Sequence, residues 1–161
     1  MKALVVSYSR TGLTAKVAEA IAKELGCQHD EIRDTIIRAG PLGFLRSGFE
    51  AAMKVCPVIS VKKDPARYDL VVIGTPVWAG TMSSPVRTYL DDNNARFKKV
   101  AFFCTSGNGN GEKIFAEMAG LGWKKPMATL ALFSKDVATG NFGENVKKFC
   151  GRLRDREQHN T

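Results

Sequence analysis

Apolar residues cluster in four short runs along the chain, and segments with a different, helical spacing of apolar residues lie between them. The runs cover residues 3–6, 68–74, 99–104 and 128–133 and are rich in β-branched or aromatic side chains. Such runs are typical of strands that are buried on both faces of a sheet. Residues 27–33 are short and polar, which is consistent with a further strand at a sheet edge.

The segments between the runs are amphipathic. In the first of them, Leu13, Val17, Ile21 and Leu25 recur on one helix face, and Gly26 is placed to end the helix. The same reasoning predicts helices over residues 42–54, 85–92 and 142–154, and one that carries Ile114, Phe115 and Met118 on one face. The polar tail after Arg154 is expected to fray.

This order of elements predicts the fold class. Strands that alternate with helices, without hairpin signals between them, pair in parallel through right-handed crossovers. We therefore expect an α/β fold, a three-layer α/β/α sandwich around a five-stranded parallel sheet. The length and the lack of linkers or repeats indicate a single domain over residues 1–161.

The first buried strand leads directly into a helix through a turn rich in hydroxyl side chains. A strand that enters a helix in this way presents free backbone N–H groups and the positive end of the helix dipole. Together with three hydroxyls, this arrangement favours a bound phosphate, although an ordinary capped turn is the alternative. The residues of the turn are Ser9, Arg10, Thr11, Gly12, Leu13 and Thr14.

Two further loops follow the next two buried strands, and in a parallel sheet all three loops lie at the same, ligand-binding edge. The second loop offers the flat ring of Trp78, and the third is glycine-rich, so its backbone can approach a planar ligand closely. A phosphate site beside a planar-ring site describes FMN. Trp78 as a core residue and Asn108 and Asn110 as turn residues are the alternatives. The candidate residues are Thr75, Pro76, Val77, Trp78, Ala79 and Gly80 in the second loop, and Thr105, Ser106, Gly107, Asn108, Gly109 and Gly111 in the third.

The composition narrows the classes of function. Lys and Arg number 24 against 16 Asp and Glu, and the net charge of +8 indicates an anionic ligand or partner. The basic pairs are dispersed, which argues against nucleic-acid binding. Four cysteines are scattered without the spacing of a metal site, so we expect buried free thiols and a cytoplasmic location. We also expect no signal peptide and no membrane span.

On these three motifs the chain resembles short-chain flavodoxins over essentially its whole length. The resemblance implies a sheet order of 2-1-3-4-5, with FMN as the cofactor. It also implies that Trp78 stacks on the isoalloxazine ring. The phosphate is then expected to bind the hydroxyls of Ser9, Thr11 and Thr14 and the backbone N–H groups of Arg10, Gly12 and Leu13.

Three departures from the family pattern bear on function. Leu13 stands where the family usually has Asn, so one side-chain contact is lost while the backbone donors remain. The third loop has no aromatic residue between Thr105 and Gly111, which should leave the outer ring face open. Ala79 replaces a common glycine whose peptide flips on reduction and stabilises the semiquinone; at positive φ, alanine costs about 1 kcal/mol more.

These departures favour an FMN-dependent oxidoreductase that moves electrons from NAD(P)H to a quinone or similar acceptor. The alternatives are a one-electron carrier flavodoxin, supplied by a reductase and serving protein partners, and a cofactor-free binding module. No catalytic side chains are identified, and His29 and His159 are read as surface residues. The alternatives for residues 40–54 are a surface helix of no functional consequence, a lip over the flavin and a homodimer contact. Its Phe44, Leu45 and Phe49 favour a packing or interface role.

Overall fold

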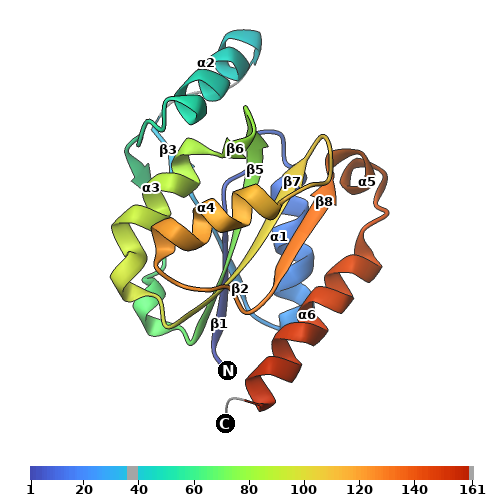
Figure 1. Cartoon of the computed structure of the whole chain (residues 1–161). Coiled ribbons are helices and arrows are strands. Elements are labelled where there is room, and N and C mark those ends of the chain that lie inside the picture. Colours follow the sequence, from blue (N-terminus) through green and yellow to red (C-terminus); the bar gives the residue numbers. More distant parts are fainter. Residues whose placement is uncertain (36–39, 160–161) are drawn as a thin grey trace.

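A central sheet of five parallel strands organises the computed structural model, which describes residues 1–35 and 40–159 (Figure 1). In space the strands run in the order β2-β1-β5-β7-β8, which is the predicted order 2-1-3-4-5. Their bounds are Ala3–Ser7 for β1, Gln28–Glu31 for β2, Leu70–Trp78 for β5, Lys99–Ser106 for β7 and Thr129–Phe133 for β8. The predicted topology is confirmed.

Helices cover both faces of this sheet (Figure 1). Helices α1 (Leu13–Leu25), α5 (Ser134–Thr139) and α6 (Gly143–Gln158) pack on one face, where Val17, Ile21 and Phe149 are fully buried. Helices α3 (Ser84–Asn93) and α4 (Glu112–Gly122) pack on the other, around Tyr89 and Met118. Short 3-10 helices, η1 (Pro65–Arg67) and η2 (Asn94–Arg96), precede β5 and β7. The three-layer architecture follows the sequence prediction.

Helix α2 (Gly40–Ala52) lies outside the two helical layers, at the end of the sheet where the parallel strands terminate (Figure 1). It begins and ends two residues earlier than predicted. The strands that precede and follow α2 in the chain, β3 (Arg33–Asp34) and β4 (Ile59–Ser60), pair with each other in an antiparallel ladder. The large apolar side chains that α2 and the residue after it leave exposed are Leu42, Phe44, Leu45, Phe49 and Met53.

The expectation of a loop at residues 75–80 is wrong. Strand β5 continues to Trp78, and β6 (Thr81–Met82) folds back to pair with it in antiparallel register. Only Ala79 and Gly80 form the turn, with φ angles of 47° and 74°. A two-residue hairpin turn of this kind favours Asn-Gly, so the Ala-Gly pair gave no hairpin signal.

The predicted end of the last helix is also wrong. Helix α6 continues four residues beyond Arg154 to Gln158, and Glu157 in this extension forms an ion pair with Lys99 at 3.1 Å. The extension is therefore anchored to the start of β7 instead of fraying. Residues 160–161 of the tail lie outside the described part. Across the described residues, no helix is both long and apolar enough to cross a membrane.

The four cysteines are free thiols in different environments. Cys104 and Cys150 are buried, and burial raises the pKa of each thiol to about 12, which makes both unreactive at neutral pH. Cys27 is partly buried. Cys56 is exposed, so the expectation that all four are buried is wrong for this residue.

Candidate functional site

A cavity of about 340 Å³ opens at the carboxyl ends of β1, β5 and β7, which is the edge where the sequence places its three motifs. This volume is within the usual range for small-molecule sites. Residues from all three predicted motifs meet in its wall. The lining residues are Arg10, Thr11, Leu13, Thr14, Phe44, Gly48, Pro76, Val77, Trp78, Ala79, Thr105, Ser106, Gly107 and Ser134.

The turn between β1 and α1 carries polar atoms that lack partners. Gly12 starts the helix at φ 88°, and no side chain caps the first-turn N–H groups. The Ser9 hydroxyl and the Arg10 Nε are buried, and neither has a hydrogen-bond partner among the described residues. A buried donor without a partner costs about 1–3 kcal/mol, so an anionic ligand beside this turn would be stabilised.

Thr14 connects the first motif to the third. Its side chain is 2% exposed, and its hydroxyl lies 2.8 Å from the hydroxyl of Thr105 at the end of β7. Each hydroxyl has one donor and two acceptor positions, so this contact leaves two further hydrogen-bonding positions at each oxygen. The hydrogen bond therefore holds the two loops together across the cavity while leaving both side chains able to contact a ligand.

Aromatic rings lie beside the guanidinium group of Arg10 in another part of the cavity wall. Trp78 is 6% exposed, and its ring meets that of Tyr8 edge-on with centroids 5.5 Å apart. The Arg10 guanidinium lies 5.8 Å from the centroid of Trp78 and 4.6 Å from that of Phe44, both within cation–π range. A planar ring can therefore be held here by stacking, beside a positive charge.

Three lining residues were missed in the sequence prediction. Phe44 and Gly48 come from α2, and Ser134 begins α5. The exposed-looking aromatic residues of α2 were the available signal for Phe44, whereas nothing in the sequence marked Ser134. Phe44 supplies an aromatic side chain to a cavity whose third loop has none.

Several predicted residues do not contribute to the wall. The Thr75 hydroxyl accepts a hydrogen bond from the Ser83 N–H at 3.0 Å, and Asn108 accepts from the Asn110 N–H at 3.1 Å, as a turn residue does. Side chains occupy the space that would have admitted a ligand beside the glycines of the third loop: the Phe133 ring over Gly109, and the Phe115 ring and Cys104 over Gly111. The predicted residues outside the wall are Ser9, Gly12, Thr75, Gly80, Asn108, Gly109 and Gly111.

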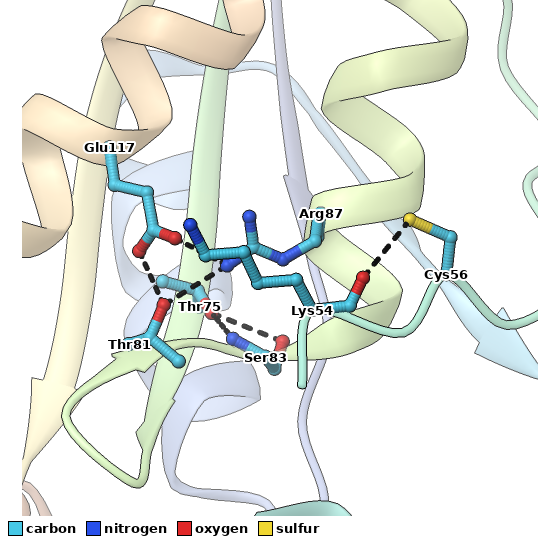
Figure 2. Close-up of polar contacts among 7 residues, drawn as sticks. All are labelled: Lys54, Cys56, Thr75, Thr81, Ser83, Arg87 and Glu117. Carbon is cyan, nitrogen blue, oxygen red and sulfur yellow. Dashed lines mark hydrogen bonds and ion pairs between the residues drawn. The ribbon is translucent and has the colours of Figure 1, made fainter. Parts of the chain in front are cut away.

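A network of charged and polar side chains supports the hairpin that carries Trp78 (Figure 2). Arg87 of α3 donates to the Glu117 carboxylate on α4 and to the Thr81 hydroxyl at 3.1 Å, and Thr81 in turn donates to Glu117. Thr81 is the direct antiparallel partner of Trp78. Two helices thus fix the position of the strand end that lines the cavity.

This network changes the ionisation of Glu117. Burial by itself raises the pKa of the carboxyl, but the hydrogen bonds from Thr81 and Arg87 outweigh it and lower the pKa below its usual value. The ion pair is largely shielded, with side-chain exposures of 6% for Arg87 and 21% for Glu117. Glu117 is therefore a charged structural support for the hairpin at neutral pH.

The hairpin also contains backbone strain. Ala79 has a φ of 47°, a region where a residue with a Cβ costs about 1 kcal/mol more than glycine. Because Ala79 lines the cavity, the strained peptide lies at the candidate site itself. The sequence predicts a positive φ at this residue only for a flipped peptide, whereas Ala79 already has one in the structure.

A family model described as flavodoxin matches residues 2–130 of the chain. A flavoprotein in complex with FMN from Lactobacillus acidophilus NCFM is 25% identical, with 86% of this chain and 97% of that chain covered and a TM-score of 0.70. A provisionally assigned flavoprotein from Bacteroides uniformis is 24% identical, with 91% of this chain and 96% of that chain covered and a TM-score of 0.75. Oxidised flavodoxin 2 from Bacillus cereus is 16% identical, with 97% of this chain and 99% of that chain covered and a TM-score of 0.58.

Replacing Glu117 tests the support of the hairpin. Glu117→Gln should destabilise the protein by about 1–3 kcal/mol at pH 7, because the Arg87 charge loses its buried partner. Since the native pKa of Glu117 is lowered, its stabilisation is present above the unfolded pKa and is lost as the pH falls through the native one. Urea unfolding of wild type and variant should therefore give curves that converge at acidic pH.

The control for this prediction is Glu144→Gln, which removes the exposed partner of Lys147 and should change stability little. An equal loss in the two variants, or a difference at Glu117 that does not depend on pH, would contradict the supporting role.

Proposed function

Because the chain belongs to the flavodoxin family, we propose that it binds FMN in the cavity at the strand ends and transfers electrons from NAD(P)H to a quinone or similar acceptor. The cofactor assignment is carried by the unpaired Ser9 hydroxyl and Arg10 Nε beside the uncapped start of α1. These are donors that match a phosphate dianion.

The residues present fit both the phosphate and the ring of FMN. The hydroxyls of Ser9, Thr11 and Thr14 and the N–H groups at the start of α1 would hold the phosphate. Trp78 and Phe44 would hold the isoalloxazine ring. The motifs provide one phosphate site, which favours FMN over FAD.

The chemistry divides between cofactor and protein. Bound FMN supplies the ability to accept and return electrons singly or in pairs. The chain binds and orients it, and α2 excludes water from part of the cavity through Phe44 and Gly48. In the overall reaction, NAD(P)H, one proton and a quinone give NAD(P)+ and a quinol. NAD(P)H supplies both electrons and one of the two protons that the quinone gains.

Three observations support a reductase over a one-electron carrier. The third loop has no aromatic residue between Thr105 and Gly111, so no aromatic side chain of that loop shields the flavin from a small donor. Ala79 is already held at positive φ by the hairpin, which leaves less freedom for a peptide rearrangement on reduction. The net charge of +8 attracts an anionic dinucleotide. A cytoplasmic location, where NAD(P)H is available, suits this proposal.

Removing the Ser9 hydroxyl tests the phosphate site. Ser9→Ala should weaken FMN binding at least about tenfold, because it removes a charge-assisted hydrogen bond of about 1.5–3 kcal/mol. The apo protein should keep its stability, since the hydroxyl has no partner among the described residues. Isothermal titration of the apo protein with FMN measures the affinity.

Ser84→Ala is a matched control, because Ser84 also has a buried hydroxyl without a described partner but lies at the start of α3 and not in the turn before α1. Equal affinities of the Ser9 variant and wild type for FMN would show that the turn does not bind the phosphate.

The direction of electron flow is tested with the FMN-loaded protein. We expect oxidation of NADH or NADPH that depends on a soluble quinone and produces one quinol for each dinucleotide consumed. Absorbance of the reduced nicotinamide and of the quinone measures both quantities. If the loaded protein consumes neither dinucleotide but accepts electrons from a reductase protein, the carrier alternative replaces this proposal.

A further inference from the structure

A second cavity, of about 410 Å³, lies between the end of α2, the β5–β6 hairpin and the start of α4. It shares Ala79 with the first cavity, so the Ala79–Gly80 turn separates the two spaces. Nothing in the three sequence motifs pointed to it. The lining residues are Ala51, Ala52, Lys54, Ala79, Gly80, Thr81, Lys113 and Glu117.

The charges around this cavity do not balance. Its one acidic group, Glu117, is paired with Arg87 and accepts a hydrogen bond from Thr81, so its charge is already matched (Figure 2). Lys54 and Lys113 contribute two positive charges, and no ion pair within the described residues involves either of them. The cavity therefore carries an excess of positive charge.

Both lysines are exposed and occupy unfavourable backbone positions. Lys54 has a φ of 56°, a left-handed conformation that a residue with a Cβ rarely adopts. Lys113 is the second residue of α4, where the positive end of the helix dipole repels a cation. Gly111 itself provides no side-chain cap, and one first-turn N–H, that of Glu112, donates to the side-chain oxygen of Asn110 at 3.1 Å. A bound anion would offset the repulsion at Lys113 and between the two lysines.

We propose that this cavity binds a phosphate group of the nicotinamide dinucleotide that donates electrons. The inference rests on the proposed function and names the residues that recognise the donor. A dinucleotide combines a planar ring with phosphate groups, and a molecule lying across the Ala79–Gly80 turn contacts both cavities. Lys54 and Lys113 bind its phosphate, while its ring end reaches the cavity lined by Trp78 and Phe44.

In this arrangement the Ala79–Gly80 turn lies beneath the dinucleotide. Gly80 carries no side chain, and nothing lies within 4 Å of the position that its Cβ would occupy. The Arg87–Glu117–Thr81 network holds the hairpin beneath the ligand and at the same time neutralises the one carboxylate that would repel a phosphate. The same side chains thus support the cofactor cavity and set the charge of its neighbour.

Charge reversal at the two lysines tests the proposal. The full chain loaded with FMN is titrated with NADP+ and, separately, with NAD+ by isothermal titration calorimetry, so that no turnover is needed. Lys54→Glu and Lys113→Glu should each weaken dinucleotide binding at least about tenfold, and the loss should shrink at high salt because the interaction is partly screened. The affinity for FMN should not change. A drop confined to NADP+ would assign the site to its 2′-phosphate, and an equal drop for NAD+ would assign it to the pyrophosphate.

Lys124→Glu is the matched control, because it makes the same change in net charge at an exposed residue that lines neither cavity. Equal weakening in all three variants would overturn the proposal and leave only a general attraction between the dinucleotide and the positive charge of the protein.

If the wild type oxidises NADPH and both lysine variants keep its dinucleotide affinity, the proposal fails while the proposed function stands. If the wild type binds FMN but neither binds nor oxidises a dinucleotide, both fail. Loss of binding to a polyglutamate peptide alone would assign the cavity to an acidic protein partner instead.

Discussion

The parallel register of β1, β5 and β7 determines where every candidate ligand group lies. Ser7 pairs with Gly74, and Pro76 pairs with Thr105, so the three strands deliver their following segments to one edge. Close packing supports this register: the ring of Phe103 fills the space beside Gly74, where a Cβ would lie 1.9 Å from it. A phosphate-binding turn and an aromatic wall can meet in one cavity only because the strands end together.

The hairpin added to this edge links structure to function. It places Trp78 in the cavity wall through an antiparallel pair with Thr81, and Arg87 and Glu117 hold that pair from the helices behind it. The cost is a strained Ala79 and a buried charge pair, both close to the candidate site. Strain and buried charge persist at functional sites when the surrounding packing determines the geometry, which is the case here.

Much of this account could be predicted from the sequence, because buried strands and amphipathic helices have strong periodic patterns. The turn around Gly12 was predictable since a strand running into a helix determines its own geometry. The hairpin could not be predicted, because its turn contains Ala79, whereas such a turn normally contains residues that tolerate a positive φ. Ser134 could not be assigned to the cavity either, and Phe44 only as one alternative for its segment, since tertiary packing alone brings α2 and α5 to the strand ends.

The central claim is that the turn before α1 recognises the phosphate of FMN, and comparison of FMN with riboflavin tests it most directly. The two ligands share the isoalloxazine ring and differ in the phosphate. Two or more charge-assisted hydrogen bonds at about 1.5–3 kcal/mol each predict that the wild-type apo protein binds FMN at least about a hundredfold more tightly. Isothermal titration with each ligand measures the difference. Equal affinities for FMN and riboflavin would contradict the account.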